Sequence, residues 1–177
     1  QVDFEFSCDD GGLDVAVFEQ VKIALEHMLR NAIDHGIDTP QARAKRGKSE
    51  TGKISLLIFR QASEFVIQLL DDGNGLDPAL LRAKAVEKGL LSERHKISDE
   101  EALRLIFNSG LSTADKVTDV SGRGVGMDIV HQVITQVGGN IAVQSKPGFF
   151  AQFDIRIPAS IMVNGALLAS IGDEQVA

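Results

Sequence analysis

The chain has 177 residues, 44% hydrophobic and 24% charged, with a formal net charge of −7. This length suits one domain with a proper core and leaves room for a fragment of a second, and the composition is that of an ordinary soluble globular protein. The negative charge and the lack of a Lys/Arg run argue against a nucleic-acid-binding surface. No apolar stretch reaches the ~18 residues that span a bilayer, so we expect no membrane insertion. The single cysteine, Cys8, rules out an intramolecular disulfide and fits a reducing, cytoplasmic compartment.

The start of the chain predicts a strand and a long helix. Val2–Phe6 alternates apolar and polar residues, as a half-buried strand does. Asp14 is a suitable N-cap for a helix that runs to about His35. One stripe of this helix is apolar at helical spacing and should face the core: Phe18, Val21, Leu25, Met28, Leu29 and Ala32.

The opposite face of this helix carries the short polar side chains of His27, Asn31, Asp34 and His35. A solvated face normally carries Lys, Glu, Gln and Arg, which form helices better than Asn, Asp and His. The pattern therefore favours a face that contacts something polar over a merely solvated one. A zinc site built from the two histidines is the third interpretation, but neither a cysteine nor an HExxH pattern supports it.

Asp38–Gly52 is a polar connection that we interpret as a surface loop. Its basic residues are Arg43, Lys45, Arg46 and Lys48. Gly47–Ser49 resembles the end of a Walker A phosphate loop, but that motif requires glycine where Ala42 stands and a strand-to-helix context. Here the segment leads from a helix into a strand, so the match fails.

Two apolar runs, Ile54–Phe59 and Phe65–Leu70, predict an antiparallel hairpin. Asp71–Gly75 follows, and Asp77–Pro78 then supplies the N-cap and first position of a helix that runs to about Lys88. A carboxylate thus stands at the end of a strand, and two glycines let a ligand lie close against the backbone. An ordinary Asp-Gly hairpin turn is the alternative, disfavoured because a helix follows rather than a second strand.

The second half of the chain combines a polar loop with a glycine-rich helix start. Ser98 and Glu101 form a capping box for a short helix. Asn108–Gly122 is polar and aperiodic, as lids and binding loops are. Gly122–Asp128 then opens an amphipathic helix, and such a start offers free N–H groups and a positive dipole end to an anionic phosphate.

The pairing of the strands predicts the fold class. Ile141–Gln144 and Phe149–Ile157 form a last hairpin, so the strands come in hairpins rather than in βαβ units. We therefore expect an α/β fold, a two-layer sandwich whose mixed, mostly antiparallel sheet is covered on one face by helices. This arrangement counts against a Rossmann dinucleotide site. The apolar segment Ile161–Ile171 is expected to begin another domain, and both chain ends are expected to be cuts within a longer protein.

The combination of motifs is more specific than any one of them. An asparagine on the long helix is followed by Asp-x-Gly-x-Gly after a hairpin, a polar lid, and Gly-x-Gly-x-Gly at a helix start. This order and spacing resemble the ATP-binding (GHKL or Bergerat) domain shared by sensor histidine kinases, gyrase B, Hsp90 and MutL. Within that superfamily the residues of these motifs are most similar to those of the CheA family of chemotaxis histidine kinases.

The resemblance covers about residues 2–158. The motifs that look like the family's N box, G1 box, F box with lid, and G2 box are His27–Gly36, Asp71–Gly75, Phe107–Thr113 and Ser121–Asp128. Leu25–Asn31 is similar to the branch that controls type IV pilus motility. We therefore expect an ATP-binding catalytic domain over residues 1–158, and residues 159–177 resemble the start of a CheW-like receptor-coupling domain.

The resemblance implies Mg-ATP as the ligand. Asp71 would accept a hydrogen bond from the adenine amino group, while Gly73 and Gly75 would let the base lie against the loop. Asn31 would bind Mg²⁺ through its side-chain oxygen, and His27 would reach the phosphates or the metal shell. The other nucleotide-binding residues that it implies are Arg30, Asp34, Lys84, Ser112, Thr113, Lys116, Gly122, Arg123, Gly124, Val125 and Gly126, the last glycines wrapping the triphosphate as the lid closes. Leu80 departs from the pattern, because some relatives carry a further lysine there.

The implied activity is that of an ATP-dependent protein-histidine kinase, with His27 and Asn31 as catalytic residues. It would transfer the γ-phosphoryl group to a histidine on a separate phosphotransfer domain, with a response regulator and a CheW-like adaptor or chemoreceptor as further partners. None of the histidines of this chain has the surroundings of the family's phospho-acceptor.

Two other classes stay open, a clamp-driving ATPase like gyrase B or MutL and a regulatory module that binds nucleotide without turnover. The ATPases usually carry a general-base glutamate close before the asparagine, and Glu26 is poorly placed for that role. Transfer of γ-phosphate to a partner histidine distinguishes the kinase from both.

The chain lacks the dimerisation segment that such kinases need, so we predict that it is a monomer. Its sedimentation coefficient should then be independent of concentration. A stable dimer at micromolar concentration would refute this prediction.

Overall fold

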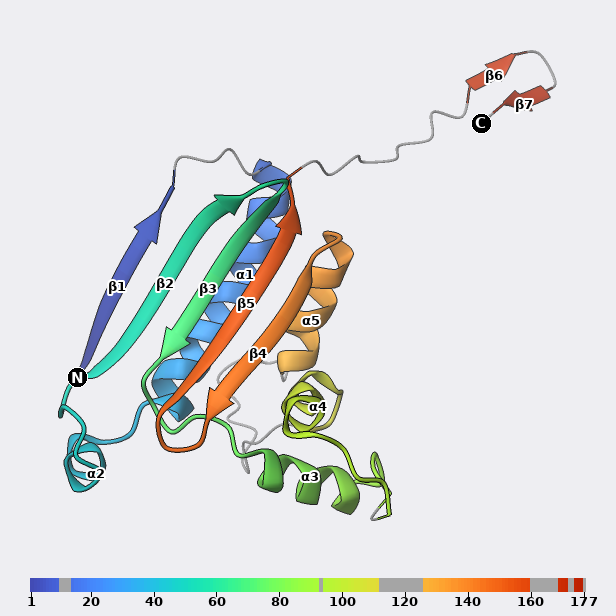
Figure 1. Cartoon of the computed structure of the whole chain (residues 1–177). Coiled ribbons are helices and arrows are strands. Elements are labelled where there is room, and N and C mark those ends of the chain that lie inside the picture. Colours follow the sequence, from blue (N-terminus) through green and yellow to red (C-terminus); the bar gives the residue numbers. More distant parts are fainter. Residues whose placement is uncertain (10–13, 93, 112–125, 160–168, 172–173, 177) are drawn as a thin grey trace.

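The computed structural model describes residues 1–9, 14–92, 94–111, 126–159, 169–171 and 174–176. Five strands form one sheet in the order β1-β2-β3-β5-β4 (Figure 1). Their bounds are β1 (Val2–Cys8), β2 (Gly52–Gln61), β3 (Glu64–Asp71), β4 (Asn140–Lys146) and β5 (Phe150–Pro158). β1 pairs with β2 in parallel, and the other three pairings are antiparallel. The predicted mixed, mostly antiparallel sheet is confirmed.

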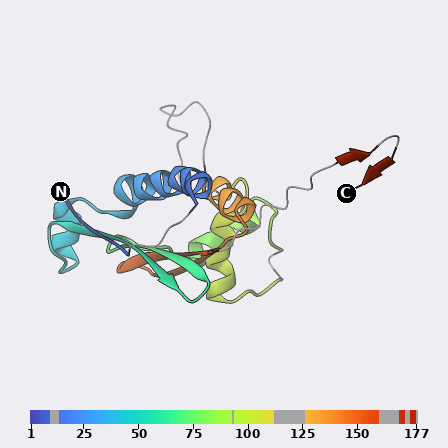
Figure 2. The ribbon, with the colours of Figure 1, turned by 90° about the horizontal axis from the view of Figure 1, so that it is seen from above.

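Helices cover one face of this sheet. Figure 2 shows α1 (Val15–Asn31) and α5 (Met127–Gln136) in one layer and the strands in the other. Three further helices, α2 (Pro40–Lys45), α3 (Pro78–Glu87) and α4 (Asp99–Arg104), lie toward the end of the sheet where β3 ends (Figure 1). A π-helical turn (Ala32–Gly36) continues α1, and a 3₁₀ turn (Leu105–Phe107) continues α4.

The core lies between the sheet and the two helices that cover it, α1 and α5. Its most buried members include Val21 and Met28 of α1, Ile134 of α5, and Ile67 and Ile155 of the sheet, each at most 2% exposed. A second cluster joins α3 and α4 through Leu81, Ala85, Leu103, Ile106 and Leu111. On the uncovered face Gln68 Nε2 donates to Asp154 Oδ1 at 2.6 Å, as expected for a polar surface. The two-layer sandwich is therefore confirmed.

The helix-start signals work as predicted. Asp14 Oδ1 accepts from the amides of Ala16 and Val17, which satisfies donors that the first turn would otherwise leave unpaired. Ser98 and Glu101 form both hydrogen bonds of a capping box at the start of α4.

The expectation of a half-buried first strand is wrong. Phe4 and Phe6 of β1 are 51% and 59% exposed, because β1 lies at the edge of the sheet and packs on β2 rather than on the helices. Phe18 was expected in the buried stripe of α1 but is 44% exposed, and Val17 and Ala24 are buried instead. The buried stripe is thus rotated away from Phe18.

The predicted second domain stays a prediction. β6 (Ala169–Ile171) and β7 (Glu174–Val176) pair in antiparallel fashion, whereas residues 160–168, 172–173 and 177 lie outside the described part of the chain. Among the helices that the structure describes, none is long and apolar enough to cross a membrane.

The buried stripe of α5 gives a stability prediction. Ile134→Ala should lower the free energy of unfolding by about 2–5 kcal/mol, because Ile134 is fully buried and its truncation leaves a cavity. Ile23→Ala on α1 is the matched control, since Ile23 is 59% exposed, and it should cost less than about 0.5 kcal/mol. Urea unfolding of both variants measures the difference, and equal losses would contradict the described core.

Candidate functional site

Three segments that are distant in sequence converge at one end of the helix layer. They are the carboxyl end of α1 with its π-helical turn, the loop that follows β3, and the first turn of α5. Their meeting is shown by contacts between Gly36 and the loop, and between Asn31 and Met127. π-helical turns are rare and often mark functional sites, and this one delivers Gly36 to the loop.

Asp71 ends β3 on the side of the sheet that faces the helices. Its residue is only 4% exposed, and burial raises the pKa of its carboxyl group from the ordinary 3.8 to about 6. The Gly73 amide donates to Asp71 Oδ1 at 3.0 Å, which opposes this rise without cancelling it. A hydrogen-bond acceptor is thus held at the base of the site.

Glycines allow the close approach of the loop to its neighbours. A Cβ on Gly73 would lie 2.0 Å from the Gly36 carbonyl oxygen, and the Asn74 amide donates to that same oxygen at 2.8 Å. Gly75 has a φ of +64°, and a Cβ there would lie 2.5 Å from the Lys146 carbonyl oxygen. The atoms that approach these two glycines here belong to the protein's own backbone, so their predicted role of letting a base lie against the loop stays a prediction.

Asn31 and His27 lie one turn apart on α1 and contact each other. The distance from Asn31 Nδ2 to His27 Nε2 is 2.9 Å, and Asn31 Nδ2 also donates to Met127 Sδ at 3.6 Å. An amide nitrogen can only donate, so His27 Nε2 is the acceptor and the ring proton belongs on Nδ1. Burial, and then the charge of Arg30, lower the pKa of His27 while Asp128 opposes them, which favours the neutral ring. The arrangement turns Asn31 Oδ1, a hard oxygen ligand, away from these partners.

The first turn of α5 starts at Gly126, which is its N-cap. The ten-residue helix brings the positive end of its dipole to this end of the helix layer, next to Asn31. A carboxylate, Asp128, lies in the same first turn. This end of the helix layer, between Asn31 and the first turn of α5, suits an anion bound together with a cation.

The remaining predicted residues fall into two groups. Arg30 and Asp34 are exposed near the end of α1, and Lys84 is partly buried on α3. The predictions for Ser112, Thr113, Lys116, Gly122, Arg123, Gly124 and Val125 lie outside the described residues.

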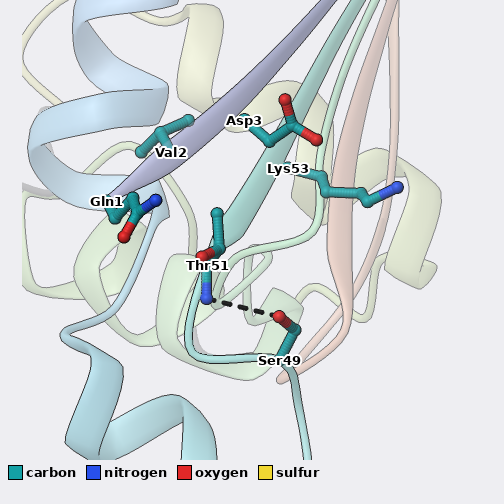
Figure 3. Close-up of a pocket in the computed structure, with 6 residues that line it drawn as sticks. All are labelled: Gln1, Val2, Asp3, Ser49, Thr51 and Lys53. Carbon is teal, nitrogen blue, oxygen red and sulfur yellow. Dashed lines mark hydrogen bonds between the residues drawn. The ribbon is translucent and has the colours of Figure 1, made fainter.

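Two surface hollows lie away from this convergence. One, of about 360 Å³, is lined by Gln1, Val2, Asp3, Ser49, Thr51 and Lys53 (Figure 3). The other, of about 870 Å³, lies between α3, α4 and β4 and includes Arg82, Arg104 and Gln144. Neither contains Asp71 or Asn31, so the candidate site is assigned by its chemistry. Within the described ranges, no three His, Cys, Asp or Glu side chains gather in a way that could hold a metal ion.

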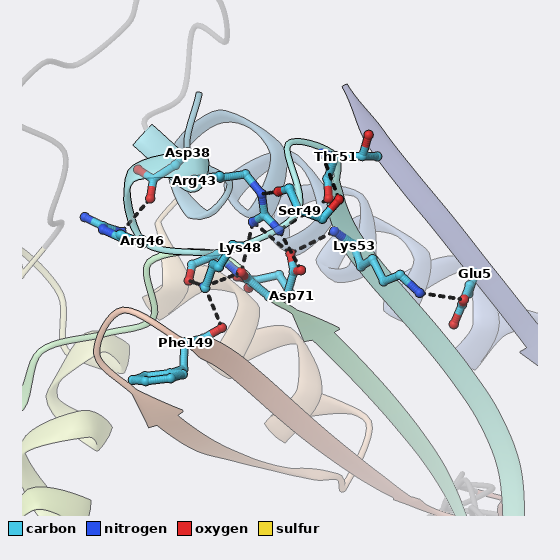
Figure 4. A network of polar contacts seen from close by, with 12 residues as sticks. Glu5, Asp38, Arg43, Arg46, Lys48, Ser49, Thr51, Lys53, Asp71 and Phe149 are labelled. Atoms are coloured by element: carbon cyan, nitrogen blue, oxygen red, sulfur yellow. Dashed lines mark hydrogen bonds and ion pairs between the residues drawn. The ribbon is translucent and has the colours of Figure 1, made fainter. Parts of the chain in front are cut away.

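The interpretation of Asp38–Gly52 as a surface loop is wrong in its centre. Thr39 caps α2 there, and Arg43 is only 1% exposed. Figure 4 shows Arg43 and Lys48 of this segment pointing to the loop after β3. Arg43 Nη2 lies 2.7 Å from Asp72 Oδ2, and Nη1 donates to Asp72 Oδ1 at 3.0 Å.

Asp72 has the opposite electrostatic environment to Asp71. Burial alone would raise the pKa of its carboxyl group, but hydrogen bonds from Arg43 and from the Lys53 amide, with the charges of Arg43 and Lys48, hold it below the ordinary value.

The described residues fit Mg-ATP. The buried Asp71 carboxylate can accept from the adenine amino group, Asn31 Oδ1 is a suitable Mg²⁺ ligand, and the first turn of α5 can receive phosphate. The site thus has an acceptor for the base, an oxygen for the metal and a dipole end for the phosphates.

Comparisons with known proteins agree with this geometry. Residues 20–161 match the family described as histidine kinase-, DNA gyrase B- and HSP90-like ATPase. The chain is 42% identical over 167 residues to the sensor histidine kinase CheAY of Helicobacter pylori, covering 93% of this chain and 21% of that protein. It is 39% identical over 176 residues to the chemotaxis protein CheA of Halobacterium salinarum, covering 98% and 26%. The chain thus spans about a quarter or less of the length of these curated relatives.

Among solved structures, the catalytic domain of histidine kinase ThkA is similar with a TM-score of 0.52 and 21% identity. The match covers 89% of this chain and 79% of that one. At this identity the likeness shows a shared fold.

The buried Asp71 predicts a pH-dependent stability difference. Because the folded state binds its proton more tightly than the unfolded state, ionisation of Asp71 costs stability as the pH rises from about 4 to above 6. Asp71→Asn keeps an oxygen for the Gly73 amide and removes the charge. It should therefore gain stability relative to the wild type over this range, reaching about 3 kcal/mol at pH 7.

Urea unfolding at a series of pH values measures this difference. A difference between the two proteins that stays constant from pH 4 to pH 8 would contradict the raised pKa of Asp71.

Proposed function

The chain belongs to the histidine kinase-, DNA gyrase B- and HSP90-like ATPase family, and from this premise we propose that it is the catalytic domain of a CheA-like histidine kinase. It binds Mg-ATP and transfers the γ-phosphoryl group to a histidine on a separate phosphotransfer domain. The observation that carries the proposal is the convergence of Asp71, Asn31 and the first turn of α5 at one corner. The names of the relatives, sensor histidine kinase and chemotaxis protein CheA, support the same function.

Each contact has a defined part in the proposed mechanism. Asp71 accepts from the adenine amino group and so fixes the base at the floor of the site. His27 accepts from Asn31 Nδ2, which orients Asn31 Oδ1 toward the metal; we propose this role for His27 rather than direct metal binding. The N–H groups at the start of α5 hold phosphate oxygens. Bound Mg-ATP supplies the transferable phosphoryl group and the metal charge that neutralises it, so the protein contributes mainly position.

The position of Glu26 supports the kinase over the clamp ATPase. Water-activating ATPases need a general base within hydrogen-bond reach of the attacking water. Glu26 is exposed on α1, and the position one turn before Asn31 is taken by His27, whose Nε2 is engaged with Asn31. The arrangement is therefore suited to receiving a nucleophile from another domain.

The proposed partners follow from the relatives. We propose a phosphotransfer domain as acceptor, and a response regulator and a CheW-like adaptor or chemoreceptor through the rest of the protein. The proposed location is the cytoplasm, where ATP is available and a lone exposed thiol such as Cys8 stays reduced.

A transfer assay tests the proposal. The chain is mixed with Mg²⁺, γ-labelled ATP and a separate histidine phosphotransfer domain of the CheA type. Label should appear on the partner as acid-labile phosphohistidine. Asn31→Ala should reduce the rate at least ~100-fold, because the metal ligand is lost. His95→Ala is the control, since His95 is exposed and outside the convergence, and its rate should match the wild type.

Two outcomes would contradict the kinase. Release of free phosphate without label on the partner histidine would indicate the clamp ATPase. Nucleotide binding with neither product would indicate the regulatory module.

A further inference from the structure

The loop that follows Asp71 is rich in hydrogen-bond acceptors. Besides Asp71 it carries the two carboxylate oxygens of Asp72 and the backbone carbonyls of Asp72 and Gly73. The Gly73 amide donates to Asp71 Oδ1 at 3.0 Å, so the backbone of this loop lies beside the proposed acceptor for the base, and a released carbonyl there could accept from the edge of that base. The structure shows that two basic side chains from the segment around α2 engage them (Figure 4).

Arg43 uses all three of its nitrogens. Besides the two contacts to the Asp72 carboxylate, Nη1 donates to the Asp72 carbonyl at 3.0 Å. Nε donates to the Ser49 carbonyl at 2.6 Å, and Nη2 to the Thr51 carbonyl at 3.3 Å. A planar fork is needed for this pattern, which an ammonium group could not reproduce. Burying such an ion pair is costly, and removing only one of its partners is strongly destabilising. We therefore expect the pair to hold the loop in position.

Lys48 closes the other side of the loop. Its Nζ donates to the carbonyls of Asp72 at 2.6 Å, Gly73 at 2.8 Å and Phe149 at 3.0 Å, which uses its three protons. The Phe149 contact ties the loop to the turn between β4 and β5. The Gly148 amide adds a second tie by donating to the Asn74 carbonyl at 2.6 Å. The loop is therefore held between α2 and the β4–β5 turn.

These contacts engage the Asp72 and Gly73 acceptors, whereas the Asp71 carboxylate accepts from the Gly73 amide and stays the proposed acceptor for the base. Adenine carries an amino donor at C6, which matches a carboxylate. Hypoxanthine carries an oxygen at C6 and a hydrogen on N1. Its C6 oxygen, which has a partial negative charge, would therefore face the negative carboxylate. If the Asp72 or Gly73 carbonyl were released, it could accept from that N1–H and lessen the mismatch.

We infer that Arg43 and Lys48 are positioning residues that set the adenine selectivity of the site, by holding the Asp72 and Gly73 acceptors away from the nucleotide. This inference rests on the proposed function, since it requires that Asp71 receives the base. It adds to that function a specificity device built from a segment outside the nucleotide-binding motifs.

Paired nucleotides test the inference. The dissociation constants of ADP and inosine diphosphate, measured by calorimetry with Mg²⁺, differ only through the C6 edge of the base. The wild type should prefer ADP at least ~100-fold, as sites built to pair a polar group do. Lys48→Met and Arg43→Lys should each lower this preference ~10-fold, the worth of a displaced hydrogen bond to a charged group.

Lys45→Met is the matched control. Lys45 ends α2, three residues before Lys48, and is exposed, so Lys45→Met removes the same charge and its preference for ADP should equal that of the wild type. Thermal melts verify that each variant is folded at the temperature of the titration. If Arg43→Lys does not fold, the partly exposed Lys48 carries the test alone.

The ratio separates selectivity from other roles. If Lys48 acted only by attracting phosphate, or only by stabilising the fold, Lys48→Met would weaken both nucleotides equally and the ratio would stay unchanged. That outcome, with a selective wild type, overturns the inference and leaves the proposed function intact. A folded wild type that binds neither nucleotide overturns both.

Discussion

The burial of the Asp71 carboxylate is the constraint on which the site depends. Removing an ionisable group from water disfavours its charged form, and here the pKa rises to about 6. The fold accepts that cost at the end of a central strand, where a rigid sheet fixes the direction of the side chain. Gly36 and Gly73 make the burial possible, since a Cβ on either would lie within 3.2 Å of Asp71 Oδ1. The π-helical turn that ends α1 is what brings Gly36 there.

The two consecutive carboxylates show how environment divides roles. Asp71 is buried with one backbone donor and has a raised pKa, whereas Asp72 faces Arg43 and has a lowered one. Adjacent groups whose pKa values are pushed apart commonly have distinct functions. Here the second carboxylate anchors the loop to α2, and the first remains for a ligand. Strand alternation causes the division, because neighbouring residues at a strand end point to opposite sides.

Local signals explain why much of the fold could be predicted from the sequence. Caps such as Asp14 and Ser98, and the hairpin pattern of the strands, act within a few residues and are visible in the sequence. The exposure of Phe4 and Phe6 was not predictable from alternation, because it depends on which strand lies at the sheet edge. The motifs around Asn31 and Asp71 predicted two of the segments that the structure brings together.

The burial of Arg43 could not be predicted, since its partner Asp72 belongs to another segment and meets it only in the folded chain.

The most direct test of Asp71 as the adenine acceptor is calorimetric titration of the folded chain with Mg²⁺ and a non-hydrolysable ATP analogue, beside Asp71→Ala. The account predicts saturable binding by the wild type and at least a ~10-fold loss in the variant, because the adenine amino group loses its acceptor. Equal affinity in the two proteins would contradict the assignment of Asp71 as the adenine acceptor.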